Sequence, residues 1–182
     1  MRVIAGKARG IQLQTPRGML TRPTTDRVKE ALFSILQFEL PGAKVLDLFG
    51  GTGQLGIEAL SRGASRAVFV DSSREACQLI RSNLKKTHLE QDAMVIQRDY
   101  MDYLNQCHEQ FRLILLDPPY AEVFLENSIK RITEIDILQS NGIIATERPL
   151  GKELPWEFPG FTRSKDYKYG QILLTFYRKN EE

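Results

Sequence analysis

The chain has 182 residues, of which 42% are hydrophobic and 26% are charged, with a net charge of +2. This length and composition are typical of one globular domain with a substantial core. They exclude a membrane protein, because no apolar run approaches the length of a span, and the basic N-terminus lacks the apolar segment of a secretion signal. The two cysteines show no metal or redox spacing. We therefore expect a single cytoplasmic domain over residues 1–182 that is monomeric and binds no metal.

The first 29 residues carry most of the positive charge. They hold seven lysines or arginines against Asp26 alone, which leaves the rest of the chain with a net charge of −4. Such an asymmetry is the electrostatic footprint of a nucleic-acid interface, although a solvated tail is the simpler alternative. Apolar residues and glycines alternate with the charges, so we expect a small basic β-hairpin extension over residues 1–20.

A regular alternation of elements follows this extension. Thr25 is expected to cap a helix that ends before Pro41, because apolar residues recur there at helical spacing. The next predicted elements are strands near 44–48, 67–70, 93–97, 112–116 and 142–146, and helices near 54–62, 73–87, 100–107 and 122–136. This α/β alternation predicts a doubly wound, mostly parallel sheet of the Rossmann-like kind.

The last part of the chain departs from that alternation. Residues 161–166 and 171–177 form two extended runs, and residues 167–170 between them carry a turn signal. We therefore predict a seven-stranded sheet that ends in an antiparallel hairpin. Residues 151–159 are expected to form a loop in which Trp156 acts as a packing lid.

A glycine-rich turn follows the first predicted strand. Residues 47–56 read Asp-Leu-Phe-Gly-Gly-Thr-Gly-Gln-Leu-Gly, and the glycines at 51, 53 and 56 have the spacing of a nucleotide-binding turn. Asp71 ends the next strand, twenty residues after Gly51, where its carboxylate can accept both hydroxyls of an adenosine ribose. NAD and S-adenosylmethionine both carry that ribose, so this pattern alone leaves the two cofactors open.

Acidic residues at other strand ends favour S-adenosylmethionine. Asp47 precedes the glycine turn, where a carboxylate suits an ammonium better than a pyrophosphate. Asp99 and Tyr100 follow the third strand and can hold an adenine amine. Asp117 follows the fourth strand at the same carboxyl edge, where open α/β sheets bind ligands. Four acidic strand ends suit a ligand that is rich in amines and hydroxyls and has no phosphate.

The residues after the fourth strand have their own signature. Residues 117–120 read Asp-Pro-Pro-Tyr, directly after the apolar run 113–116. Proline has no backbone N–H and fixes φ, so this turn presents acceptors rather than donors. Acceptors suit a planar exocyclic amine, and the Tyr120 ring suits stacking on the heterocycle that carries it.

These motifs resemble the amino-methylating group of class I S-adenosylmethionine-dependent methyltransferases, whose signature is Asn or Asp, two prolines and an aromatic residue. The opening of the chain is similar to that of the RsmD family, the bacterial ribosomal RNA guanine-N2 methyltransferases. The similarity there lies in residues 2–10, Arg-Val-Ile-Ala-Gly-Lys-Ala-Arg-Gly, and 22–33, Arg-Pro-Thr-Thr-Asp-Arg-Val-Lys-Glu-Ala-Leu-Phe. The resemblance covers nearly the whole chain. It implies methylation of a guanine N2 amine in small-subunit ribosomal RNA, either free or in an assembling subunit.

The expected site combines the motifs with this resemblance. The expected catalytic residues are Asp117, Pro118, Pro119 and Tyr120. The expected cofactor-binding residues are Thr24, Asp47, Gly50, Gly51, Gly53, Asp71, Asp99 and Tyr100. The residues expected to bind RNA are Lys7, Arg9, Arg17 and Arg22.

Three alternatives stay open. An NAD-dependent dehydrogenase is disfavoured by the acidic strand ends and by the terminal hairpin. A non-catalytic RNA-binding protein on a decayed methyltransferase fold is disfavoured because every motif residue is chemically competent. An adenine-N6 methyltransferase acting on RNA or DNA fits the Asp-Pro-Pro-Tyr motif equally well, because adenine and guanine both carry an exocyclic amine.

Overall fold

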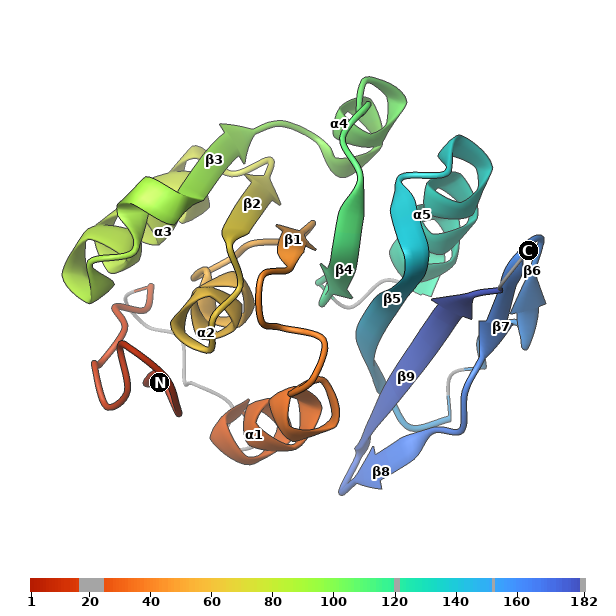
Figure 1. Cartoon of the computed structure of the whole chain (residues 1–182), viewed down its shortest axis with the longest axis horizontal. Helices are drawn as coiled ribbons and strands as arrows, with labels where there is room; N and C mark the ends of the chain where they lie inside the picture. The colour runs from red at the N-terminus through yellow and green to blue at the C-terminus, as the bar shows by residue number, and fades with distance from the viewer. Residues whose placement is uncertain (17–24, 120–121, 152, 181–182) are drawn as a thin grey trace.

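The computed structural model describes residues 1–16, 25–119, 122–151 and 153–180 (Figure 1). Its α-helices are α1 (Thr25–Ile35), α2 (Gln54–Ser61), α3 (Arg74–Thr87), α4 (Tyr100–Asn105) and α5 (Glu122–Ile135). Its strands are β1 (Lys44–Asp47), β2 (Arg66–Asp71), β3 (Ala93–Gln97), β4 (Phe111–Leu116), β5 (Leu138–Pro149), β6 (Glu157–Phe158), β7 (Phe161–Arg163), β8 (Tyr167–Tyr169) and β9 (Ile172–Lys179). Within this described part of the chain, no helix is long and apolar enough to cross a membrane.

All nine strands found in the described ranges belong to one sheet. Its order is β3-β2-β1-β4-β5-β9-β7-β6, with β8 paired to β9. Strands β1 to β5 are parallel to one another, whereas β9 runs antiparallel to β5, β7 and β8. This confirms the predicted mostly parallel α/β sheet with antiparallel strands at its C-terminal end. The parallel register brings the carboxyl ends of β1, β2 and β4 to one edge.

Helices cover both faces of this sheet (Figure 1). Side chains that alternate along a parallel strand point to opposite faces, and β4 shows this clearly. Leu113 and Leu115 belong to the core under α1, α2 and α3. Ile114 and Leu116 belong to the second core, which packs against α4 and α5. The sheet is therefore doubly wound, as its α/β alternation predicts.

Local details differ from the sequence-based expectations. The sheet has nine strands rather than seven, because the short β6 and β8 were not predicted. Residues 167–169 form β8 instead of a turn, and the chain reverses at Gly170, whose φ is +61°. Helix α1 starts at Thr25 rather than after it and ends at Ile35, followed by a hydrogen-bonded turn up to Glu39.

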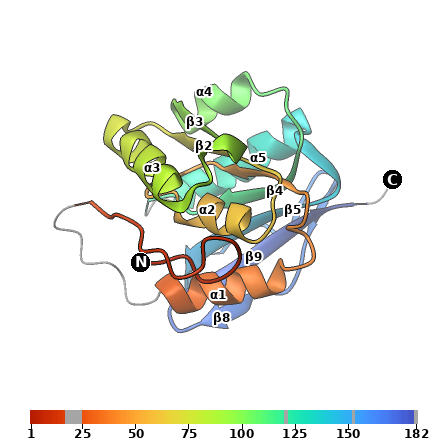
Figure 2. The same ribbon diagram turned by 60° about the vertical axis from the view of Figure 1, so that its left-hand side comes forward.

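The N-terminal segment is part of the core rather than a separate flap. Val3, Ala8 and Leu13 are buried in the same cluster as α1 and α2. The expected hairpin is reduced to one antiparallel bridge between Arg2 and Gln12, supported by a few backbone hydrogen bonds. Figure 2 shows this segment lying against α1 and α2. The buried apolar side chains hold the segment against the helices, so the charged side chains of the segment have defined positions.

A buried ionic network attaches this segment to the helices. The Lys29 ammonium is 2% exposed and lies 3.9 Å from the carboxylate of Glu58, which is fully buried. Lys29 also donates to the Arg2 carbonyl at 2.6 Å, and Glu58 accepts from the backbone N–H of Ile4 at 2.8 Å. Burial lowers the pKa of Lys29, and the nearby carboxylates oppose that shift. Lys29 is thus a structural cation and is not available to nucleic acid.

Candidate active site

The carboxyl ends of β1 and β4 meet at a pocket. Asp47 is the last residue of β1, and Asp117 follows the last residue of β4 directly. The pocket lies between these two carboxylates and the turn that joins β1 to α2. It is lined by Met1, Asp47, Phe49, Gly50, Gly51, Thr52, Gln54, Leu55 and Asp117. The fold thus brings together residues that are seventy positions apart in the sequence.

Asp47 is a buried carboxylate that is only half satisfied. Its Oδ2 accepts a hydrogen bond from the backbone N–H of Gly56 at 3.0 Å. Its Oδ1 is also buried and has no hydrogen-bond partner among the described residues. Burial raises the pKa of Asp47 to about 8, the Gly56 N–H opposes this shift, and the charges of Asp117 and Asp71 add to it.

Gln54 is a site residue that the sequence analysis missed. It is the first residue of α2 and lines the same pocket. Its Oε1 atom is buried and has no hydrogen-bond partner in the described part of the chain. Two acceptors without donors in one pocket suit a ligand that brings N–H groups, and an ammonium fits this best. The residues present therefore fit the amino acid end of S-adenosylmethionine.

Asp71 holds the glycine turn from the neighbouring strand. Its Oδ2 accepts from the backbone N–H of Gly51 at 2.9 Å, and its Oδ1 accepts from that of Ser73 at 2.8 Å. Gly51 has a φ of +56° and Gly53 a φ of +79°, a region that favours glycine. Each carboxylate oxygen can accept a second bond, so Asp71 can still bind ribose hydroxyls while it orders the turn.

Gly50 packs closely against α3. A Cβ atom at Gly50 would lie 2.7 Å from Cδ1 of Ile80 on α3. The turn therefore passes close to α3, and a side chain at this position would displace the end of the Ile80 side chain. Gly50 lies outside the formal glycine spacing, and it lines the pocket.

Aromatic rings gather beside the turn. The Tyr100 ring lies 5.2 Å from that of Phe49 and 5.4 Å from that of Phe124, measured between centroids. Phe49 lines the pocket, so this cluster can form an apolar wall for a heterocycle. Asp99 is exposed and caps α4, with its Oδ1 accepting from the backbone N–H of Met101 at 2.8 Å. The sequence analysis missed Phe49 and Phe124, because apolar aromatic residues also occur in any core.

Two of the residues expected to bind RNA, Lys7 and Arg9, lie away from this pocket. Lys7 and Arg9 are exposed, and the Lys7 backbone N–H donates to the Ser61 carbonyl at the C-terminal end of α2. The glycine turn is at the other end of α2, about 10 Å away by the rise of the helix. The expected site residues Arg17, Arg22, Thr24 and Tyr120 lie outside the described residues.

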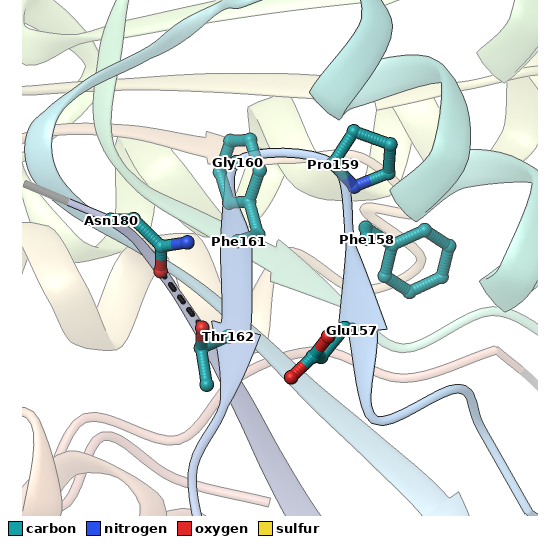
Figure 3. A pocket seen from close by; sticks show the side chains of 7 residues that line it. All are labelled: Glu157, Phe158, Pro159, Gly160, Phe161, Thr162 and Asn180. Carbon is teal, nitrogen blue, oxygen red and sulfur yellow. Dashed lines mark hydrogen bonds between the residues drawn. The ribbon is translucent and has the colours of Figure 1, made fainter. Parts of the chain in front are cut away.

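A second hollow lies on the β6–β7 hairpin (Figure 3). It is lined by Glu157, Phe158, Pro159, Gly160, Phe161, Thr162 and Asn180. Thr162 Oγ1 donates a hydrogen bond to Asn180 Oδ1 at 2.8 Å between two of these residues. It shares no residue with the pocket at the carboxyl edge, and its lining includes one carboxylate, Glu157, rather than a pair. We therefore assign the chemistry to the carboxyl edge.

Comparison with known proteins agrees with this geometry. YlbH of Bacillus subtilis is 39% identical to this chain, over 98% of this chain and 99% of that protein. Ribosomal RNA small subunit methyltransferase D of Escherichia coli is 31% identical, over 100% of this chain and 91% of that protein. The solved structure of the Escherichia coli protein yhhF superposes with a TM-score of 0.90 at 30% identity and covers 100% of this chain and 99% of that one.

The strand order, the antiparallel C-terminal strands and the pocket at the carboxyl edge define an enzyme of the class I methyltransferases. The family model described as conserved hypothetical protein 95 matches residues 1–178. The chain therefore belongs to this family, which is the RsmD family, and the resemblance found in its sequence is confirmed.

Proposed function

We propose that this protein transfers a methyl group from S-adenosylmethionine to the exocyclic N2 amine of a guanine in small-subunit ribosomal RNA. The RNA class is supported by the full-length similarity to ribosomal RNA small subunit methyltransferase D. The choice of a guanine amine follows from the resemblance of the N-terminal block to that of the guanine-N2 enzymes, because the Asp-Pro-Pro-Tyr motif fits an adenine amine equally well.

One observation carries the cofactor proposal. The Oδ1 atom of Asp47 and the Oε1 atom of Gln54 are buried acceptors that find no donor among the described residues, and both residues line the pocket that also contains Asp117. An ammonium would satisfy both atoms. Asp71 would accept the ribose hydroxyls, and the rings of Phe49 and Tyr100 would contact the adenine. Gly51 and Gly53 would allow the cofactor to approach the backbone closely.

The bound cofactor supplies a methyl group that its sulfonium has already activated, so the protein mainly supplies position and electrostatics. Asp117 and the carbonyl of Pro118 accept hydrogen bonds from the target amine and thereby orient its lone pair. The charge of Asp117 also stabilises the positive charge that develops on the nitrogen. The proton can leave late, because the amine becomes acidic once it is methylated. Asp117 therefore need not be a strong base.

The test is methylation of ribosomal RNA in vitro. The protein is incubated with labelled S-adenosylmethionine and either free small-subunit RNA or small subunits from a strain that lacks the gene. We expect label in one nucleoside, N2-methylguanosine, from at least one of the two substrates. Recovery of N6-methyladenosine would replace the guanine proposal with the adenine alternative. Labelling of neither substrate, with the cofactor shown to bind, would refute the proposed substrate.

A further inference from the structure

Asn83 is a polar residue on the buried face of α3. The buried residues of this helix recur at helical spacing, at Cys77, Ile80, Asn83, Leu84 and Thr87. Asn83 is fully buried, and an amide is stable in such a place only if its hydrogen bonds are made. Its partners therefore show which parts of the chain it holds together.

The Asn83 amide joins two segments that are distant from it in the sequence. Its Nδ2 donates to the carbonyl of Thr52, in the glycine turn, at 2.9 Å. The same Nδ2 donates to the Gln14 carbonyl at 3.0 Å, and Oδ1 accepts from the Gln14 backbone N–H at 2.7 Å. The partners are all backbone groups, so Asn83 fixes the position of the glycine turn relative to the N-terminal segment, residues 1–16.

The N-terminal segment also contacts the glycine turn at the pocket. Thr52 Oγ1 donates to Sδ of Met1 at 3.3 Å, and both residues line the pocket at the carboxyl edge. The Leu13 N–H donates to the Met1 carbonyl at 3.1 Å, so Met1 is tied to the stretch that Asn83 holds. The wall of the pocket is therefore built partly from the N-terminal segment.

The same segment presents exposed cations. The Val3 N–H donates to the Ile11 carbonyl at 3.0 Å, and the Gly10 N–H donates to the Val3 carbonyl at 2.9 Å. These bonds close a loop that carries Lys7 and Arg9, whose side chains are exposed. The pocket wall and the two cations thus belong to one hydrogen-bonded unit.

We propose that Asn83 is a positioning residue that couples the cofactor pocket to the N-terminal segment. A ligand at the glycine turn restricts Thr52, and through Asn83 and Gln14 it restricts the segment that presents Lys7 and Arg9. RNA that binds to the ordered segment loses less conformational entropy, so the cofactor and the RNA bind with positive cooperativity. This rests on the proposed function and adds to it a link between its two ligands.

The test measures the RNA affinity of the full-length protein with and without S-adenosylhomocysteine, which carries no methyl group to transfer. For wild type we expect the dissociation constant of small-subunit ribosomal RNA to fall by about 5-fold or more when S-adenosylhomocysteine saturates the protein, and the reverse effect should have the same size. In Asn83→Ala the ratio of the two constants should be about one. A purely structural residue would lower stability without changing this ratio.

Thr87→Val is the matched control on the same helix. Thr87 is buried one turn after Asn83, and its hydroxyl donates to the backbone carbonyls of Asn83 and Leu84. The variant should lower the melting temperature and keep the wild-type ratio.

A second pair of variants acts from the surface and decides the question if Asn83→Ala does not fold. Gln14 is exposed, so neither variant disturbs the core. Gln14→Pro removes the backbone N–H that donates to Asn83, whereas Gln14→Ala keeps it. Gln14→Pro should lower the ratio towards one, and Gln14→Ala should stay near the wild-type value.

Hydrogen exchange reads the same link without RNA. S-adenosylhomocysteine should slow exchange of the Gln14 amide in wild type, and this protection should be absent in Asn83→Ala. A Gln14 amide that bound S-adenosylhomocysteine does not protect, or a ratio in Gln14→Pro equal to that of wild type, would overturn the inference. Protection of the amide in a protein that binds no ribosomal RNA would instead reject the proposed function and leave the positioning role of Asn83 standing.

Discussion

The backbone N–H of Gly56 donates to Oδ2 of Asp47 at 3.0 Å, while Oδ1 of the same carboxylate is buried without a hydrogen-bond partner among the described residues. Gly56 can lie this close because it has no side chain: a Cβ atom there would be 2.2 Å from the Phe69 ring. Helix α2 therefore packs directly on the sheet. The result is one satisfied oxygen and one oxygen available to a ligand, in a carboxyl group whose pKa is raised to about 8.

Asp47→Asn should stabilise the protein when no cofactor is bound. The folded-state pKa of Asp47 is above its unfolded value of 3.8, so its contribution to stability is fully present below pH 3.8 and is lost as the pH rises to about 8. Asparagine does not ionise, so the variant does not lose stability as the pH rises through this interval. We expect the advantage of the variant to grow over that interval to on the order of 1–3 kcal/mol, or roughly 2–10 °C in melting temperature.

The measurement is thermal unfolding of wild type and variant at several pH values, with cofactor affinity measured in parallel. Asp47→Asn should bind S-adenosylmethionine much more weakly, because the ammonium loses its carboxylate. A variant that melts below wild type at pH 8 would contradict the assigned pKa.

Cofactor affinity should depend on pH. Asp47 is mostly protonated at pH 7 and must lose its proton to pair with an ammonium, so the apparent affinity should rise by up to tenfold per unit as the pH increases towards 8. Above pH 8 the ligand's own α-amino group loses its proton, so the affinity should fall again. Calorimetry between pH 6 and 9 measures the profile. The rising limb should be absent in Asp47→Asn, and a flat wild-type profile would refute the pairing.

Asp71→Ala should weaken S-adenosylmethionine binding by about 1.5–3 kcal/mol, the range for hydrogen bonds to a charged group. Part of the loss would come from the turn, since Asp71 also accepts from the Gly51 backbone N–H. Asp71→Asn keeps an acceptor for Gly51 and should lose less. Calorimetry with melting temperature as the fold control separates the two effects. Unchanged affinity in both variants would remove Asp71 from the site.

Asp117→Ala should abolish methyl transfer and leave cofactor affinity within a few-fold of wild type, because the main partner of Asp117 is the target amine. Asp117→Asn is the matched control. The signature that the chain resembles allows either residue, so the amide should retain measurable turnover. Single-turnover transfer to saturating RNA checks both variants. Near-normal transfer by Asp117→Ala would show that the assigned role is wrong.

Neutralising Lys7 and Arg9 together should lower RNA affinity and flatten its salt dependence by about 0.7–0.9 in log–log slope for each phosphate that the variant no longer neutralises. Substitution is preferable to truncation, because Val3, Ala8 and Leu13 of the same segment are buried in the core. The control is neutralisation of Lys85 and Lys86, which are exposed in the last turn of α3. Equal salt slopes for the two double variants would refute a specific role for the N-terminal cations.

Much of the fold could be predicted, because short apolar runs alternating with helical patterns and glycine turns encode a doubly wound sheet locally. The position of Asp47, Asp71 and Asp117 could also be predicted, because a residue at the end of a parallel strand lies at the carboxyl edge of the sheet. The short strands β6 and β8 were not predicted. A strand of two or three residues is too short to show an alternating hydrophobic pattern. The extended conformation of β6 and β8 comes from their pairing with β7 and β9.

The sequence by itself determined the order of the elements, the position of the glycine turn and the set of carboxylates at one edge. Only the tertiary structure decided which charged side chains are exposed to solvent and which are buried in ion pairs. Lys29 appears as one more cation of the basic segment, yet it is buried against Glu58. Gln54 and Trp156 carry no motif, yet one presents a buried acceptor and the other is an exposed ring held by Arg163 rather than the expected packing lid. Burial and pairing depend on residues distant in the chain, so no local pattern reports them.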